Sequence, residues 1–265
     1  MLLCQITDLH IKAGGTRTYG VVDTVAMLRA CVAHILDLPQ RPDVVVATGD
    51  LVDLGRAEEY ALLRELLAPL PMPVYLLPGN HDDRETLRAA FPDHAYLRQW
   101  PPFVQYVLDD YPVRIVALDS VIPREGGGRL CGDRLEWLDA ALAAAPARAT
   151  IVVMHHPPFR TFIGHMDRIG LEGADGLARV IAKHPQVERV LCGHLHRPIV
   201  ARFAGTVAST CPSPAHQIAL DLSEDGIEGF TMEPPGYQLH RWDAGAGVIS
   251  HTVTIGNWPG PYSFD

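Results

Sequence analysis

The sequence predicts an α/β fold in which the main sheet is largely parallel. Three short apolar runs have the length and composition of buried strands, at residues 2–6, 44–47 and 74–77. Each run is followed by a stretch with the apolar spacing of a helix, at residues 22–38, 57–67 and 85–90. Strands that alternate with helices form βαβ units, and such units build parallel sheets.

The pattern changes after residue 100. Residues 103–108 and 114–118 flank a turn at 109–112 and are predicted to form a hairpin, and Asp133 is placed to cap the N-terminus of a helix. Further short apolar runs predict strands at 151–154, 187–191, 206–209, 217–222, 229–232 and 248–255. The later part of the chain is therefore expected to form a second sheet and an accessory element.

The length predicts one main domain with an addition at its C-terminal end. A chain of 265 residues suits a single α/β domain that we place at residues 1–222. Residues 223–265 are rich in aromatic residues and proline and contain no cluster of metal-binding side chains. This segment is predicted to form a cap or a subunit contact, or else a wrap packed on its own domain, which is at least as well supported.

The charge of the chain excludes some classes of partner. A formal net charge of −9 argues against binding to a nucleic-acid polymer, because affinity for that backbone depends on clustered lysine and arginine. Small phosphorylated substrates stay possible, since bound cations reverse the local field of a site. No stretch approaches the ~20 apolar residues of a membrane-spanning helix, and no basic amphipathic segment indicates membrane attachment.

The cysteines and the N-terminal sequence favour the cytoplasm. The five cysteines are odd in number and contain no C-x-x-C pair, which suits reduced thiols better than a disulfide framework. Asp8 interrupts the first apolar run after a few residues, so no secretion signal is predicted.

Five loops after predicted strands carry side chains that bind metals. They are Asp8-Leu9-His10, Gly49-Asp50, Gly79-Asn80-His81, His155-His156 and Gly193-His194-Leu195-His196. Any one of these is weak evidence in a chain with 13 histidines, but five in this order are hard to explain as packed core residues. Polar groups just past parallel strands gather at one edge of a sheet. The loops together predict a two-metal hydrolytic site, and donors limited to oxygen and nitrogen suit Mn, Fe, Co or Zn.

This ordered set resembles the calcineurin-like metallophosphoesterase superfamily over residues 1 to about 220. The resemblance implies a four-layer αββα sandwich of two mixed β-sheets flanked by helices, with a small C-terminal accessory or cap element. It also implies two divalent metal ions that share Asp50 as a bridging ligand. One ion is expected to bind Asp8, His10, Asp50 and His196, and the other Asp50, Asn80, His155 and His194.

Other segments are similar to the bacterial glycerophosphodiesterase and class III cyclic-nucleotide phosphodiesterase group. These segments include Tyr19-Gly20, Arg41-Pro42-Asp43, Gly55-Arg56, residues 78–83, residues 154–158 and residues 192–194. This resemblance implies that Asn80, His81 and His216 contact the substrate. Asp50 and His81 are the expected catalytic residues, and His81 either stabilises the transition state or protonates the leaving alkoxide.

The leading hypothesis is a dinuclear phosphodiesterase that cleaves small, glycerophosphodiester-like substrates by attack of a metal-bound hydroxide. A 3′,5′-cyclic-nucleotide phosphodiesterase, a phosphomonoesterase and a nuclease of the same fold remain as alternatives. A metal-free scaffold is disfavoured, because so polar a cluster is costly to bury without metal. A homo-oligomer is possible. His156 should face away from the metals by alternation, and His34, His165 and His184 are expected to face solvent.

Overall fold

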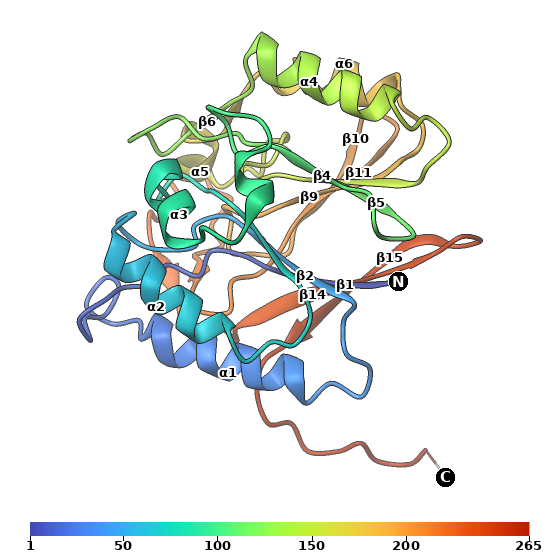
Figure 1. The fold of residues 1–265 in the computed structure, drawn as a ribbon. Coiled ribbons are helices and arrows are strands. Elements are labelled where there is room, and N and C mark those ends of the chain that lie inside the picture. Colours follow the sequence, from blue (N-terminus) through green and yellow to red (C-terminus); the bar gives the residue numbers. More distant parts are fainter. Residues whose placement is uncertain (265) are drawn as a thin grey trace.

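Two mixed sheets pack face to face in the computed structural model, which describes residues 1–264, and helices cover their outer faces (Figure 1). The first sheet has the order β15 (Gly247–Thr254), β14 (Gly236–Asp243), β1 (Leu2–Ile6), β2 (Val44–Thr48) and β3 (Val74–Leu77). Strands β1, β2 and β3 are parallel, with Leu3 opposite Val44 and Val45 opposite Val74, whereas β14 joins β1 antiparallel.

The second sheet has six strands. Their order is β10 (Val200–Phe203), β11 (Thr206–Thr210), β9 (Val187–Cys192), β7 (Thr150–Val153), β5 (Arg114–Ala117) and β4 (Tyr106–Leu108). The four inner strands are parallel and the two edge strands are antiparallel to their neighbours. The hairpin predicted from 103–118 is thus confirmed. Two short pairs lie outside the sheets, β6 (Gly128–Arg129) with β8 (Leu171–Glu172) and β12 (Gln217–Ile218) with β13 (Phe230–Thr231).

Helices form the two outer layers. The first sheet is covered by α1 (Thr24–Leu36) and α2 (Ala57–Leu67), with α3 (Arg84–Ala90) beside α2, and the second sheet by α4 (Gly132–Ala143) and α6 (Ala174–Ala182) (Figure 1). The short helix α5 (Gly164–Arg168) and a 3₁₀ turn (Ala95–Arg98) lie in connections. The predicted four-layer αββα sandwich is confirmed. The predicted cap at Asp133 is wrong: α4 begins at Gly132 after Cys131, which places Asp133 in the first turn, where a negative charge favours the helix dipole.

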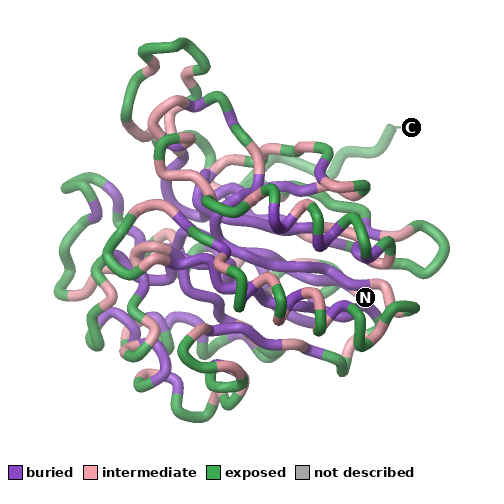
Figure 2. The backbone as a smooth tube through the Cα atoms, turned by 90° about the horizontal axis from the view of Figure 1, so that it is seen from above, coloured by how far each residue is buried: buried purple, intermediate pink, exposed green. Residues whose placement is uncertain are grey.

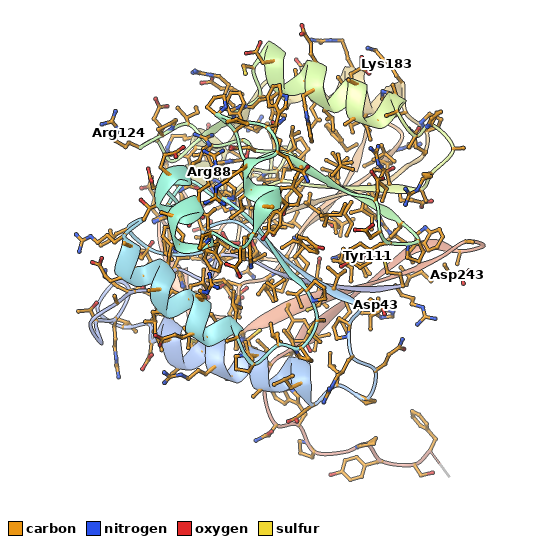
Figure 3. The ribbon with its side chains drawn as sticks, in the orientation of Figure 1. Asp43, Arg88, Tyr111, Arg124, Lys183 and Asp243 are labelled. Atoms are coloured by element: carbon orange, nitrogen blue, oxygen red, sulfur yellow. The ribbon has the colours of Figure 1, made fainter. Side chains whose placement is uncertain are left out.

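Alternation along the central strands divides the core into two packed regions. Ile115, Ile151 and Leu191 pack in the region that holds the first sheet with α1 and α2. Val116 and Val152 belong instead to the region beneath α4 and α6. Successive strand side chains point to opposite faces, so β5, β7 and β9 each contribute to both regions. The strands form the buried centre in Figure 2, and charged side chains such as Arg124 and Lys183 lie at the periphery in Figure 3.

The C-terminal segment contributes strands to the first sheet. Strands β14 and β15 form a hairpin, and β14 pairs with β1 along Leu2 to Gln5. The sequence did not predict β14. It predicted longer strands at 217–222 and 229–232, where only the two-residue strands β12 and β13 form. The boundary between residues 222 and 223 stays a prediction. Among residues 1–264, no helix has the length and hydropathy needed to cross a membrane.

Candidate metal centre

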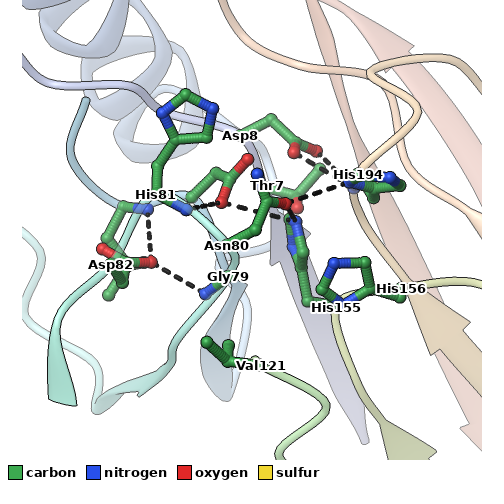
Figure 4. Close-up of polar contacts among 12 residues, drawn as sticks. Thr7, Asp8, Gly79, Asn80, His81, Asp82, Val121, His155, His156 and His194 are labelled. Carbon is green, nitrogen blue, oxygen red and sulfur yellow. Dashed lines mark hydrogen bonds and ion pairs between the residues drawn. The ribbon is translucent and has the colours of Figure 1, made fainter. Parts of the chain in front are cut away.

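The five predicted loops meet at the carboxyl ends of strands from both sheets. Asp8 and His10 follow β1, Asp50 follows β2 and Asn80 follows β3, whereas His155 follows β7, and His194 and His196 follow β9. The buried Gln5 side chain joins the two sheets just below these loops, because its amide nitrogen donates to Thr48 Oγ1 at 2.9 Å and to the carbonyl of Cys192 at 2.9 Å. The parallel strands therefore deliver all seven side chains to one place, and Figure 4 shows four of them, Asp8, Asn80, His155 and His194.

The first group of donor atoms comes from both sheets. His10 Nε2 lies 3.2 Å from His196 Nε2 and 3.6 Å from Asp50 Oδ2. Asp8 Oδ1 lies 3.6 Å from His196 Nε2. These four side chains form the set that the resemblance implied for one metal.

The second group shares Asp50 with the first. Asn80 Oδ1 lies 3.1 Å from both His155 Nε2 and His194 Nδ1. Asp50 Oδ1 lies 3.4 Å from His155 Nε2, so the two carboxylate oxygens of Asp50 face different groups. The arrangement is the one expected of a bridging carboxylate.

The donor atoms fit two metal ions. Ligand atoms about 2.0–2.2 Å from one ion lie roughly 3–3.6 Å from each other, which is the spacing within each group. The far nitrogens of three histidines are held by backbone carbonyls: His155 Nδ1 by Thr48 at 2.8 Å, His194 Nε2 by Ile169 at 3.1 Å and His196 Nδ1 by His216 at 3.0 Å. A ring N–H that donates outward leaves the lone pair of the other nitrogen for a metal.

Burial sets the protonation of most candidate ligands. It lowers the pKa of His194 to about 3 and the pKa of His196 well below its usual range, which keeps these imidazoles neutral as metal binding requires. Burial also raises the pKa of Asp8 to about 7. His155 differs: burial acts to lower its pKa, but the adjacent Asp50 raises it to about 9. Cations in the centre would favour the charged carboxylates and the neutral histidines together.

The backbone at the centre is strained. Five of the seven candidate ligands have left-handed φ angles, which are Asp8 (53°), His10 (44°), Asp50 (48°), His194 (70°) and His196 (51°). Such conformations are uncommon for residues other than glycine. They cluster at functional sites, where the surrounding structure holds the strained backbone in place. The bends turn consecutive side chains of one loop toward a common point.

Gly79 allows the loops of Asp50 and Asn80 to approach each other. A Cβ at Gly79 would lie 2.8 Å from His155 Cε1 and still closer to the Asp50 side chain and backbone. We expect Gly79→Ala to displace Asp50 and to reduce kcat about 10²-fold, as a misplacement of ~1 Å can. Steady-state kinetics would check this, with Gly132→Ala as the control because a Cβ at Gly132 meets no atom within 4 Å.

Two supporting carboxylates were missed by sequence reasoning. Asp82 Oδ2 accepts hydrogen bonds from Leu51 N at 3.0 Å and Gly79 N at 2.8 Å, which fixes the loop after Asp50 against the loop before Asn80. Asp53 Oδ1 lies 3.6 Å from His10 Nδ1. In the sequence, both look like ordinary loop carboxylates, and only the meeting of the loops reveals their contacts.

His81 stands at the mouth of the centre. Its backbone N–H donates to Asp50 Oδ1 at 2.9 Å, and its Nδ1 bonds the carbonyl of Asp53 at 2.8 Å. Burial acts to lower the pKa of His81, but Asp50 and Asp53 outweigh it and raise this pKa above its usual value. The two carboxylates therefore favour the protonated form of His81.

Two cavities open beside the centre and share Asn80 and His81 in their walls. One, of about 420 Å³, also contains His10, Asp50, His194, His196 and His216. The other, of about 750 Å³, is walled by the loop around Val121–Gly126 and the start of α3. In the smaller cavity, the ring of His216 lies 4.5 Å from that of His196 and 5.2 Å from that of Phe230. The predicted residue His216 is thus at the site.

The remaining histidines only partly match the predictions. His156 is buried behind the centre and contacts His155 and His194. The prediction that His184 faces solvent is wrong, because it is buried and pairs with Asp139 at 2.7 Å. His165 lines the smaller cavity, and His34 forms a hydrogen bond with the Tyr237 hydroxyl at 3.0 Å. Both residues were predicted to face solvent and are only partly exposed.

The model of the calcineurin-like phosphoesterase family matches residues 1–198, which contain all seven candidate ligands. The chain belongs to this family. It is 39% identical to a probable glycerophosphodiester phosphodiesterase GpdQ of Arcobacter nitrofigilis, with 100% of this chain and 97% of the relative covered. It is also 39% identical to a probable cyclic nucleotide phosphodiesterase of Rhodopseudomonas palustris, over 89% of this chain and 86% of the relative.

A solved structure shows the same fold. A dimetal phosphatase from Danio rerio superposes with a TM-score of 0.63 at 16% identity, over 96% of this chain and 99% of that one. At this identity, the likeness concerns the fold alone. The family match and the two relatives confirm the predicted membership of this superfamily.

Proposed function

We propose that the chain is a dinuclear metal-dependent phosphodiesterase that hydrolyses small, glycerophosphodiester-like substrates. The observation that carries the proposal is the division of seven donor side chains into two groups that share Asp50, with one oxygen of Asp50 facing each group. A relative that matches 100% of this chain over 97% of its own length is a probable glycerophosphodiester phosphodiesterase, which supports the substrate class.

Two divalent ions would be held by the side chains already described. Asp8, His10 and His196 would hold the first, Asn80, His155 and His194 the second, and Asp50 both. When bound, such a pair activates a water molecule and neutralises the charge that develops on the phosphate. Mn, Fe, Co and Zn all suit the donors, since each accepts imidazole nitrogen and carboxylate oxygen.

The protein itself supplies the proton for the leaving group. His81 lies in the walls of both cavities, so it would border a substrate bound in either one. Its Nδ1 is bonded to Asp53, which leaves Nε2 as the nitrogen available to the leaving oxygen. Asp50 and Asp53 raise the pKa of His81 above its usual value, which favours the protonated ring that a general acid needs. His216 and Asn80 would position the substrate from the smaller cavity.

A cyclic-nucleotide phosphodiesterase is the second candidate. The Rhodopseudomonas palustris relative reaches the same identity over a slightly shorter match. Tyr19 and Phe230 stack with ring centroids 5.1 Å apart beside His216, and this aromatic wall could also accept a base. A phosphomonoesterase is the third candidate, since its substrate would bind the same metals.

We expect glycerophosphodiesters to be preferred over cyclic nucleotides, and both over phosphomonoesters. A monoester dianion is attracted more strongly to the metals but presents a more electron-rich phosphorus. The test is kcat/KM for glycerophosphoethanolamine, 3′,5′-cyclic AMP and a simple monoester in Mn²⁺-reconstituted enzyme, together with metal content per chain. A higher value for cyclic AMP would move the chain to the cyclic-nucleotide branch. A dominant monoester value would refute the diesterase proposal, and absence of metal with no turnover would favour a scaffold.

The proposal also covers the location and the partners of the enzyme. We place it in the cytoplasm, where reduced cysteines and small phosphodiesters are both expected. Its net charge of −9 disfavours a nucleic-acid polymer as substrate, and we propose no membrane partner. A homo-oligomer would suit the exposed aromatic residues Trp258 and Tyr262 beyond β15.

A further inference from the structure

His156 lies directly behind the second group of donor atoms. It is fully buried, and its ring centroid is 4.8 Å from that of His155 and 4.6 Å from that of His194. The ring stands nearly perpendicular to His155, at 88°. His156 therefore contacts both histidines assigned to the second ion, and Figure 4 shows it beside them.

The hydrogen bonds of His156 leave it no lone pair for a metal. Its Nδ1 lies 2.8 Å from Ser120 Oγ, and its Nε2 lies 3.2 Å from the carbonyl of Gly126. A carbonyl can only accept, so Nε2 carries the proton and Nδ1 accepts from the serine hydroxyl. Both nitrogens of a neutral imidazole are then satisfied. His155, His156 and His194 come close enough together to form a metal-binding trio, but this bonding makes His156 the member that does not bind.

We propose that His156 is a positioning residue that fixes the rings of His155 and His194 and is itself held by the loop at residues 120–128. This inference rests on the proposed metal centre. The same loop forms a wall of the larger cavity through Val121, Arg124 and Gly126. A shift of this loop would therefore reach the second ion through His156. Within residues 1–264, no hydrogen bond, ion pair or ring contact joins His156 or this loop to Asp8, His10 or His196 in the first group.

The close packing of Gly128 provides a probe that changes no functional group. A Cβ at Gly128 would lie 2.5 Å from His156 Cγ and as close to Nδ1, so alanine there must displace the ring. A Cβ at Gly132, at the start of α4, would meet no atom within 4 Å beyond its own helix and chain neighbours. Gly128→Ala and Gly132→Ala thus make the same chemical change, but only Gly128→Ala presses on His156.

The experiment measures the affinity of the two Mn²⁺ ions in the wild type, Gly128→Ala, Gly132→Ala, Ser120→Ala and His156→Phe. Competition with a chromogenic chelator gives the affinities, and anomalous diffraction from crystals at limiting Mn²⁺ shows which group keeps its ion. We expect Gly128→Ala and His156→Phe to weaken the ion at Asn80, His155 and His194 by ~10–100-fold, the usual cost of losing support behind a metal ligand. The other ion should bind as in the wild type, and Gly132→Ala should match the wild type for both ions. Ser120→Ala should weaken the ion at Asn80, His155 and His194 to a smaller extent.

Several results would overturn the inference. Wild-type affinities in both Gly128→Ala and His156→Phe would remove the positioning role. Loss of the second ion in His156→Phe, with wild-type affinities in both Gly128→Ala and Ser120→Ala, would make His156 a ligand. Equal weakening of both ions would indicate general disruption, and if Gly128→Ala fails to fold, Ser120→Ala decides between the same outcomes. A wild-type protein that binds no metal would instead refute the proposed function.

Discussion

Replacement of Asp50 by alanine is expected to abolish hydrolysis and to remove both metal ions. Asp50 faces both groups, with Oδ2 3.6 Å from His10 Nε2 and Oδ1 3.4 Å from His155 Nε2. Without it, each group loses a charged ligand, and the other donors stay buried around an empty space. We expect kcat to fall by ~10⁴-fold or more, as when a member of a catalytic unit is removed. Elemental analysis and steady-state kinetics on the purified variant measure the two effects.

A matched control for Asp50→Ala is Asp83→Ala. The carboxylate of Asp83 is close in sequence to Asn80 but accepts from Thr86 N at 2.8 Å, where it caps α3. Its loss should cost about 1 kcal/mol of stability and leave metal content unchanged. Two metals per chain and normal turnover in Asp50→Ala would show that the bridge is misassigned. Loss of metal in both variants would point to a fold defect instead.

The strands that support the centre were predictable because most of their side chains are buried. Such strands appear as mainly apolar runs, and β1, β2, β3, β7 and β9 were each predicted to within about one residue. The ligand loops follow these strands directly. Since parallel strands end at the same edge, the order of the loops in the sequence was enough to predict that they meet.

The parts that escaped prediction depend on contacts distant in sequence. Strand β14 carries polar residues such as Gln238 and His240 that are buried only because β14 pairs with β1. His240 Nε2 bonds Gln5 at 3.1 Å, across more than 200 residues of chain, and no local pattern reports this. Likewise, the sequence predicted an exposed His184, because only the fold places this residue beside Asp139 of α4. The amphipathic helix α6, in contrast, had a clear signal at residues 174–182 and could have been found.

His81→Ala is expected to keep both metals and to lose rate by ~10²–10⁴-fold, the usual contribution of a positioned acid. The hydrogen bond from residue 81 to Asp50 Oδ1 comes from the backbone N–H and survives the substitution, so the bridging carboxylate stays in place. Only the imidazole is lost, and with it the proton for the leaving oxygen. Elemental analysis would show that the metals are retained, and kcat on a natural diester would show the loss of rate.

The size of the defect should depend on the leaving group. An alkoxide from glycerophosphoethanolamine has a high pKa and needs a proton as it departs, whereas a nitrophenolate leaves readily without one. The ratio of wild-type to variant kcat should therefore be much larger for the natural diester than for a nitrophenyl diester. His251→Ala, at an exposed position on β15, serves as the control and should change neither ratio. Equal losses on the two substrates would mean that His81 binds the phosphate without donating a proton, and loss of metal would mean that its ring supports Asp50 after all.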